Sequence, residues 1–180
     1  MIYHKHNSIN GIKIIDLHPF YDDRGVLVES YKKRDLLINT DFCQDNLVNS
    51  NYSCLRGLHF QSEPFAQSKL ITVIKGKIQD VALDIRESSS TFGHYFSIVL
   101  SEDDFKQIFI PKGFAHGFLT LSKTSTVHYK MDNIYKPDHQ SGIAFNDEDL
   151  NIDWAINHNE IIVSDKDRNN PKFSGIQYFK

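Results

Sequence analysis

Two of the nine histidines in this sequence, His59 and His116, lie in segments whose residue types could do chemistry. His59 belongs to Arg-Gly-Leu-His-Phe-Gln (56–61), and His116 follows a Pro-Lys-Gly turn within residues 111–118. An imidazole has an unperturbed pKa of about 6.5, so it can bind a metal or transfer a proton near neutral pH. A histidine on a strand can also be a satisfied core residue. Taken alone, the two histidines leave metal binding, proton transfer and packing open.

The segment Pro-Lys-Gly-Phe-Ala-His-Gly-Phe (111–118) resembles the second motif of the cupin superfamily, whose members are small jelly-roll barrels. A metal-binding cupin has a first motif with two histidines one residue apart and a glutamate, whereas the matching region here offers only His59. With His116 that makes two ligands, fewer than a catalytic zinc or an iron facial triad uses. We therefore expect a metal-free barrel in which His59 is available for proton transfer.

Further motifs make the resemblance more specific. In order along the chain they are Gln44-Asp45-Asn46, residues 56–61, Lys69, residues 113–118, Tyr129-Lys130 and Asp153-Trp154. Their order and spacing resemble the dTDP-4-dehydrorhamnose 3,5-epimerase family from about residue 22 to residue 167. The resemblance implies a homodimer that inverts C3 and C5 of dTDP-4-keto-6-deoxy-D-glucose, for deoxysugar synthesis such as that of L-rhamnose. It also implies that residues around Phe20 complete the cleft of the partner copy.

The same resemblance implies four catalytic residues. His59 would be the general base, and Asp167 would pair with it, although Asp165 lies two residues away and could serve instead. Tyr129 would return a proton from the other face, and Lys69 would steady the developing enolate oxygen. The residues that would hold the nucleotide and sugar are Arg24, Glu29, Gln44, Asn46, Arg56, His116 and Lys166, with Tyr135 as a second cleft tyrosine. The chain departs from the family at Gln140, where a glutamate near the sugar is usual.

These residue types suit the reaction. Inverting a carbon next to a ketone means removing a proton from one face and delivering one to the other. Histidine is a suitable base, a carboxylate on its other nitrogen fixes the tautomer, and tyrosine stays protonated at neutral pH. A buried cation near the keto oxygen stabilises charge that develops in the transition state. No redox cofactor is required, and the sequence contains no GxGxxG fingerprint.

The elements that must position these residues are predicted to be short strands. Aromatic residues, which favour strands, are frequent, with 13 Phe and 8 Tyr. Two strands are expected around the turn at Gly76 in residues 70–86, and further strands at residues 95–100, 107–110, 115–121 and 126–131. Helical signals are weak and are confined to residues 32–38 and 147–154. Short strands separated by Gly and Pro predict a mainly β sandwich or barrel, and we expect one jelly-roll domain over residues 1–180 with short flanking helices.

One geometric difficulty lies in the His59 motif. Strict alternation along a strand would place Arg56 and His59 on opposite faces. Both can reach one cleft only if the strand bulges near Gly57, which a glycine permits.

The bulk properties exclude several other classes. The formal net charge of −3 gives no basic bias for nucleic-acid binding. No run approaches about 18 apolar residues, so no membrane span is expected. The two cysteines are predicted to be free thiols in a reducing compartment, and the expected location is the cytoplasm.

Three alternatives remain open from the sequence. The nearest is a sister enzyme of the same fold, either a single-site 3- or 5-epimerase or a ketoisomerase on a related nucleotide sugar, because Gln140 leaves the preferred sugar open. The second is a barrel that binds a sugar nucleotide without catalysis, against which the His59, Asp167 and Tyr129 set argues. A metal-dependent cupin is the third.

Overall fold

The computed structural model of the chain describes residues 2–5, 9, 11–33 and 40–176, and in these residues nearly all regular structure is antiparallel β. A six-stranded sheet has the order β1 (Ile2–Lys5), β2 (Lys13–Asp16), β10 (Lys106–Ile110), β7 (Lys69–Lys75), β12 (Thr124–Met131), β5 (Gln44–Asn51). A five-stranded sheet has the order β13 (Gln140–Gly142), β6 (Leu55–Gln61), β11 (Phe114–Thr120), β8 (Lys77–Asp84), β9 (Tyr95–Ser101). Strands β3 (Pro19–Asp22) and β4 (Gly25–Val28) form a separate hairpin.

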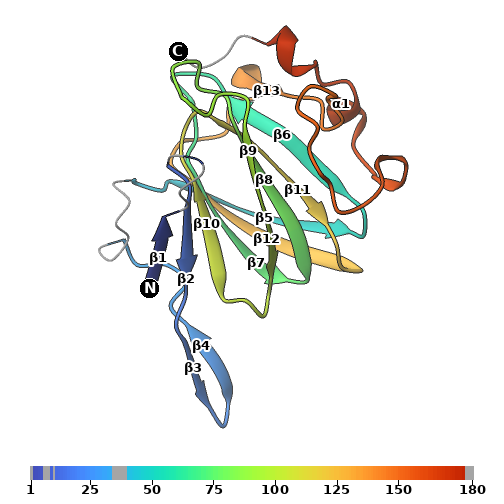
Figure 1. Cartoon of the computed structure of the whole chain (residues 1–180). Coiled ribbons are helices and arrows are strands. Elements are labelled where there is room, and N and C mark those ends of the chain that lie inside the picture. The colour runs from blue at the N-terminus through green and yellow to red at the C-terminus, as the bar shows by residue number, and fades with distance from the viewer. Residues whose placement is uncertain (1, 6–8, 10, 34–39, 177–180) are drawn as a thin grey trace.

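The two large sheets face each other and enclose an apolar interior (Figure 1). Ile71 and Val127 from the six-stranded sheet pack there against Phe118 and Ile78 from the five-stranded sheet, and all four are fully buried. Alternate residues of β11 point the other way, since Ala115 belongs to a different cluster on the outer face. This arrangement is a cupin-like jelly roll, which confirms the predicted fold class.

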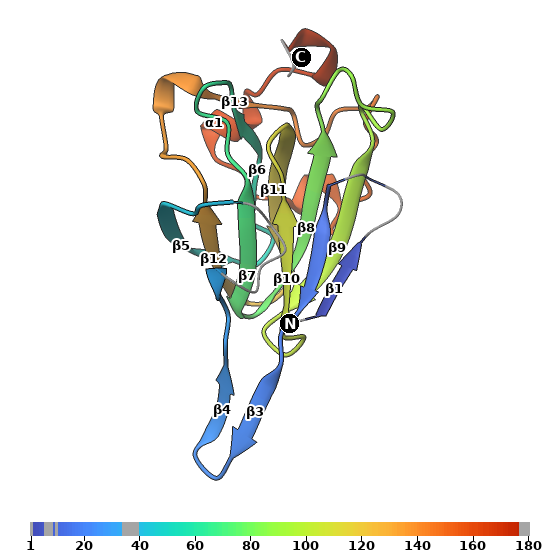
Figure 2. The same cartoon turned by 90° about the vertical axis from the view of Figure 1, so that its left-hand side faces the viewer.

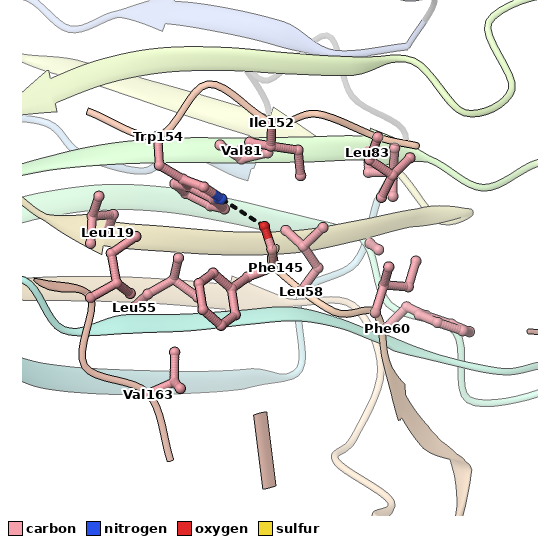
Figure 3. Packing of buried hydrophobic residues seen from close by; sticks show 14 of the residues in the cluster. Leu55, Leu58, Phe60, Val81, Leu83, Leu119, Phe145, Ile152, Trp154 and Val163 are labelled. Atoms are coloured by element: carbon pink, nitrogen blue, oxygen red, sulfur yellow. Dashed lines mark hydrogen bonds between the residues drawn. The ribbon is translucent and has the colours of Figure 1, made fainter. Parts of the chain in front are cut away.

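The outer face of the five-stranded sheet is covered by the C-terminal part of the chain. Residues 143–163 lie across β6, β11 and β8 and bury the aliphatic side chains of those strands (Figure 3). Trp154 anchors this segment, because its indole Nε1 donates a 2.9 Å hydrogen bond to the carbonyl oxygen of Phe145. The C-terminal part of the chain also contains short helices: η2 (Pro137–His139), η3 (His158–Glu160), α1 (Asp165–Arg168) and η4 (Phe173–Gly175). The segment thereby brings α1 against β6.

The β3–β4 hairpin extends away from the barrel in two perpendicular views (Figures 1 and 2). Its apolar side chains are largely exposed, with Tyr21 at 71% and Leu27 at 64%. An apolar hairpin with so few contacts to its own barrel is a candidate interaction surface.

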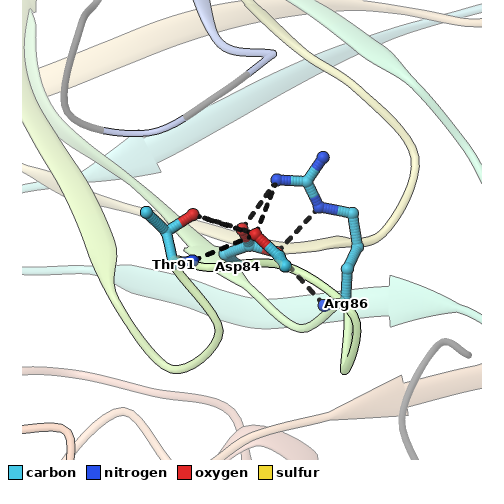
Figure 4. A network of polar contacts seen from close by, with 4 residues as sticks. Asp84, Arg86 and Thr91 are labelled. Carbon is cyan, nitrogen blue, oxygen red and sulfur yellow. Dashed lines mark hydrogen bonds and ion pairs between the residues drawn. The ribbon is translucent and has the colours of Figure 1, made fainter.

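A buried polar network fixes the turn before β9 and the start of β11 (Figure 4). Asp84, which is fully buried, accepts two hydrogen bonds from the side chain of Arg86 at 2.8 and 2.6 Å. The hydroxyls of Ser89 and Thr91 donate to the same carboxylate at 2.6 and 2.7 Å. The Arg86 guanidinium in turn lies 4.6 Å from the ring centroid of Phe114, the first residue of β11. The network therefore helps to place the strand that carries His116.

The strands predicted from residue 70 to residue 131 are all confirmed, as β7 to β12. The turn of helix expected within residues 147–154 is present as a single hydrogen-bonded turn, in which Asn151 N–H donates to the carbonyl of Asp147 at 3.0 Å, and no longer helix forms there. Asn151 has a φ of +44°, which ends the turn before a helix can continue. Most of the helix predicted at residues 32–38 lies outside the described residues. None of the described helices is long and apolar enough to cross a membrane.

Candidate active site

A pocket of about 560 Å³ opens between the two sheets, where β5 and β12 of one sheet face β6 and β13 of the other. One side of it is lined by Ile162, Val163 and Ser164 and by two residues of α1, Lys166 and Asp167. Ten of the residues predicted from the sequence line this pocket: Asn46, Arg56, His59, Lys69, His116, Tyr129, Tyr135, Gln140, Lys166 and Asp167. Its volume is in the range of sites that hold a small-molecule ligand.

His59 and Asp167 form the central pair. The Nε2 atom of His59 lies 2.5 Å from Oδ1 of Asp167, and the other carboxylate oxygen accepts a hydrogen bond from the Gly57 backbone N–H at 3.3 Å. The Asp167 side chain is 5% exposed and the His59 side chain 25%, so the carboxylate is behind the ring and the ring reaches the pocket. Burial by itself would raise the pKa of Asp167, but the hydrogen bonds from His59 and Gly57 bring it below its usual value. Asp167 is therefore ionised and fixes the tautomer of His59.

The position of Asp167 is set by the first turn of α1. Ser164 caps this helix, because its Oγ accepts a 3.1 Å hydrogen bond from the Asp167 backbone N–H. Asp165, one helical position from the cap, is solvent-exposed. Of the two candidate carboxylates in the sequence, Asp167 is the one that contacts His59.

The bulge predicted near Gly57 is present in β6. On the partner strand, His116 pairs with His59 while Phe118 pairs with Arg56, so three steps along β6 match two along β11. Gly57 has a φ of +131°, and a side chain there would meet the backbone of β11. The bulge turns Arg56 and His59 toward the same pocket, as the sequence required.

Lys69 and Tyr129 lie on β7 and β12, in the sheet opposite His59. The Lys69 ammonium donates a 3.4 Å hydrogen bond to the carbonyl oxygen of His59. Burial lowers the pKa of Lys69 to about 8, although the negative charge of Asp80 limits the fall. Burial raises the pKa of Tyr129 well above its usual value, and Asp80 adds to this effect. At neutral pH the site therefore holds a cation at Lys69 and a protonated phenol at Tyr129.

His116 forms a second histidine–carboxylate pair, deeper in the barrel. Its Nε2 lies 2.9 Å from Oδ2 of Asp80, and both side chains are buried. Burial lowers the pKa of His116, outweighing the attraction of Asp80. The ring also lies edge-on to Tyr129, with centroids 5.8 Å apart. His116 is thus neutral at pH 7 and can offer the ligand a hydrogen bond rather than a charge.

Polar side chains at the mouth of the pocket hold one another in place. Gln140 Oε1 accepts hydrogen bonds from the Tyr135 hydroxyl at 2.7 Å and from the Lys166 ammonium at 2.8 Å. Because an ammonium group can only donate, the oxygen of the Gln140 amide must face Lys166. Arg56 is held from the other side, where Ser50 Oγ accepts from its Nε at 3.0 Å. The mouth therefore carries two cations, Arg56 and Lys166.

Three predicted binding residues do not line the pocket. Gln44 lies beside it, since its Oε1 accepts from the Tyr135 backbone N–H at 2.7 Å and its Nε2 donates to Asn46 at 3.1 Å. Arg24 and Glu29 are exposed, on the β3–β4 hairpin and just after it, and Arg24 forms an ion pair with Asp22 on the same hairpin. Gln44 can act by positioning its neighbours, whereas the hairpin residues cannot reach the pocket of their own chain.

Two residues of the site were missed by the sequence analysis. Asp80 sits in β8 between the inward-facing residues Ile78 and Ala82, and a carboxylate at an inward position of a strand was a usable signal. Gln61, the last residue of the His59 motif, was not assigned a role. Its side chain donates to the carbonyls of Phe65 and Ile134 and accepts from the Lys136 N–H, so it positions the loop that carries Tyr135.

No cluster of three or more His, Cys, Asp or Glu side chains suited to a metal occurs in the part of the chain that the structure describes. The two histidines in the pocket each contact an aspartate instead. The arrangement is one for moving protons and holding an anion.

Comparisons with known proteins agree with this chemistry. The sequence profile of the family described as dTDP-4-dehydrorhamnose 3,5-epimerase matches residues 6–175. The dTDP-4-dehydrorhamnose 3,5-epimerase of Methanothermobacter thermautotrophicus is 42% identical over 166 residues, which cover 90% of this chain and 89% of that protein. The crystal structure of the enzyme of that name from Elizabethkingia anophelis superposes with a TM-score of 0.93, at 40% identity and 99% coverage of both chains.

A third similar protein was solved with a ligand. The dTDP-6-deoxy-D-glucose-3,5-epimerase of Legionella pneumophila, in complex with dTDP-4-keto-L-rhamnose, superposes with a TM-score of 0.91 at 38% identity. The match covers 95% of this chain and 92% of that one. With its fold, its pocket and its matched length in agreement, this chain belongs to the dTDP-4-dehydrorhamnose 3,5-epimerase family.

Proposed function

We propose that this chain inverts C3 and C5 of dTDP-4-keto-6-deoxy-D-glucose by stepwise enolisation, with His59 as the base. The observation that carries the proposal is the pair formed by His59 on β6 and Asp167 on α1, which faces Tyr129 and Lys69 on the opposite sheet. A base and an acid on opposite walls of one pocket are what inversion of a carbon requires. Simple binding of a nucleotide sugar requires neither.

Each inversion takes two proton transfers. His59 removes the proton from the carbon next to the keto group, and the electron pair of the C–H bond moves to the keto oxygen as an enolate. The Lys69 ammonium stabilises that oxygen, and the Asp167 carboxylate stabilises the imidazolium that forms. The Tyr129 hydroxyl then donates its proton to the opposite face of the same carbon, and the keto group is restored. His59 then gives up its proton and Tyr129 regains one, by exchange with solvent, before the same groups repeat these steps at the second carbon.

The cations at the mouth of the pocket suit the diphosphate of a dTDP-sugar. Arg56 can bind a phosphate in a bidentate manner, and Lys166 adds a second positive charge. Lys166 is held by the neutral amide of Gln140, so its charge is not cancelled by a carboxylate there. Asn46 and Tyr135, beside Gln140, provide hydrogen-bonding and stacking groups for the sugar and the base.

The β3–β4 hairpin supports a homodimer. Phe20, Tyr21, Val26 and Leu27 are each at least half exposed, with fractions of 56, 71, 50 and 64%. If a second copy covers these side chains, Arg24 and Glu29 lie at the pocket of that second copy. This explains why neither residue reaches the pocket of the chain to which it belongs. Cys43 and Cys54 are free thiols, which fits a reducing compartment, and we place the enzyme in the cytoplasm.

The decisive experiment is incubation with dTDP-4-keto-6-deoxy-D-glucose in heavy water, followed by mass spectrometry and NMR of the sugar. Two deuterons per sugar with both centres inverted are expected. One deuteron would identify the single-site epimerase or ketoisomerase of the same fold, and none would contradict catalysis on this sugar. A His59→Ala variant should still bind dTDP but lose exchange, and retained exchange would remove His59 from the role of base.

The dimer can be tested by mixing two inactive variants, His59→Ala and Arg24→Ala. After random reassociation half of the dimers contain both chains, and one of the two pockets in each is intact, so about a quarter of wild-type activity should return. The absence of any recovery on mixing would contradict a pocket shared between chains.

A further inference from the structure

Asp80 is a buried carboxylate to which the proposed reaction gives no task. It lies on β8 with no exposure to solvent. One oxygen, Oδ2, is held by Nε2 of His116 at 2.9 Å. The other oxygen, Oδ1, is buried and has no hydrogen-bond partner among the described residues. A buried carboxylate oxygen left without a partner is costly, so its retention calls for a reason.

The group whose charged form this carboxylate stabilises is Lys69. Its ammonium is in the barrel interior. Within the described residues it forms one hydrogen bond, of 3.4 Å, to the carbonyl oxygen of His59. A lysine in such surroundings loses its proton easily, because burial disfavours the charged form. The electrostatic attraction of Asp80 opposes that loss.

The other groups that face Lys69 do not supply a negative charge. His59 of β6 and His116 of β11 are histidines, and Tyr129 of β12 keeps its proton because burial raises its pKa. Asp167 is engaged with His59 and the backbone of β6. Of the strands around Lys69, β8 alone contributes a carboxylate that has an oxygen free.

We propose that Asp80 is a positioning residue of the active site, which keeps Lys69 in its ammonium form opposite the enolate oxygen while His116 anchors the carboxylate. Lys69 without its charge would be a weak partner for an enolate, so Asp80 acts on the reaction through Lys69 and need not touch the sugar. The inference rests on the proposed function, since it assumes that Lys69 serves the enolate.

The test is the pH dependence of kcat for deuterium exchange in the wild type and in Asp80→Asn. In the wild type the rate should fall as pH rises through about 8, where Lys69 loses its proton. In Asp80→Asn this alkaline limb should move toward acid, by about one pH unit or more, because the ammonium of Lys69 loses the attraction of a nearby negative charge. An alkaline limb that stays in place would overturn the inference.

Asp147→Asn is the matched control. Asp147 is also a buried aspartate, 3% exposed, and it lies outside the pocket, in the segment 143–163 that covers the five-stranded sheet. Its carboxylate accepts hydrogen bonds from the N–H groups of Asp149 and Phe173. Its variant removes a buried carboxylate without touching Lys69. A shift of the alkaline limb in Asp147→Asn equal to that in Asp80→Asn would show a general effect of weakened structure and would likewise overturn the inference.

Ionisation of Lys69 can also be followed without catalysis, by the pH dependence of its acetylation measured by mass spectrometry. Only the free amine reacts, so the midpoint of the profile should be lower in Asp80→Asn than in the wild type. The two measurements test the two proposals separately. If the wild-type enzyme shows no deuterium exchange, the proposed function is contradicted. If the midpoint of the acetylation profile is the same in Asp80→Asn as in the wild type, the role of Asp80 is contradicted.

A double variant covers the case in which Asp80→Asn does not fold. Lys69→Met in the same chain removes the cation that would otherwise be left without its counter-charge. Recovery of folded protein in Asp80→Asn/Lys69→Met, followed by circular dichroism, is the expected result. Equal failure of the single and the double variant would show that Asp80 acts on the fold independently of Lys69.

Discussion

His59 and His116 stand directly opposite each other on the antiparallel strands β6 and β11, and each contacts an aspartate through Nε2. The two pairs differ in burial, because the His59 side chain is 25% exposed and that of His116 only 3%. A base must reach its substrate and exchange its proton, so the exposed pair suits proton abstraction. The buried pair suits a structural and electrostatic task.

Asp167→Asn should reduce kcat about 10²–10⁴-fold with little change in KM. An amide at this position can hold the His59 ring but cannot stabilise the imidazolium, and it permits the wrong tautomer. Steady-state kinetics with the keto-sugar measure the effect. Asp165→Asn, in the same helix but exposed, is the control and should keep wild-type kinetics; an equal loss in both variants would argue against the pair.

Tyr129→Phe should separate proton removal from inversion. The phenyl ring keeps its packing against Phe118, but the proton donor on the second face is lost. His59 can still remove a proton and return a deuteron to the same face, so exchange should continue while inverted product falls at least about 10²-fold. NMR of the sugar in heavy water distinguishes the two outcomes. Tyr95→Phe, outside the pocket, should invert normally, and full inversion by Tyr129→Phe would exclude Tyr129 as the acid.

Asp84→Asn should lower the free energy of unfolding by about 3 kcal/mol, because it leaves Arg86 without its buried counter-charge. Although burial acts to raise it, the pKa of Asp84 is held below its usual value by hydrogen bonds from Arg86, Ser89 and Thr91. This stabilisation is therefore complete above about pH 4, the unfolded-state value, and is lost as pH falls through the lower folded-state value.

Urea unfolding from pH 7 to pH 3 tests both statements about Asp84. The stability difference between wild type and Asp84→Asn should be largest near neutrality and should shrink in acid. Asp103→Asn, an exposed aspartate in the turn after β9, should stay within about 0.5 kcal/mol of wild type. A constant difference across the pH range would show that the charge of Asp84 is not what stabilises the turn.

Gly57→Ala should destabilise the protein by about 3 kcal/mol or more and abolish exchange. The added methyl carbon would lie 2.5 Å from Cα of Gly117 and 2.8 Å from the carbonyl oxygen of His116, so β6 and β11 would have to separate. Gly25→Ala is a close control, because Gly25 has a similar φ of +127° but no heavy atom near its missing side chain. It should show backbone strain of about 1 kcal/mol in thermal unfolding. Equal costs at the two sites would mean that steric contact between the strands is unimportant.

The sequence predicted the later strands well because they alternate or are apolar and are bounded by Gly and Pro. Strand β5 escaped prediction, since Gln44–Asn51 is a polar edge strand with mostly exposed residues. Residues 147–154 predicted no more than a turn of helix, and the structure has a single turn there whose apolar residues pack on a sheet. Local patterns could not reveal this, since the covering segment is defined by the sheet it lies on.

The candidate site was predictable where motifs stand close together in sequence. The Gly57 bulge followed from the need to bring Arg56 and His59 to one pocket, and the structure has it. Asp80 was missed because its meaning depends on neighbours from other strands. The role of Arg24 could not be tested on a single chain, because a single chain leaves this residue on an extended hairpin.

The pairing of His59 with Asp167 spans 108 positions of the chain, from the second quarter of the sequence to a short helix beyond the last strand. During synthesis on the ribosome, every strand through β13 has been made before the carboxylate emerges. Because folding during translation proceeds from the N-terminus, the barrel and much of its pocket can form while His59 still lacks its carboxylate partner. A product truncated between residues 163 and 166 would keep the segment that covers the five-stranded sheet but would lack Asp167. It would hold nucleotide sugar while enolising it slowly, so premature termination there would yield a protein that sequesters its substrate.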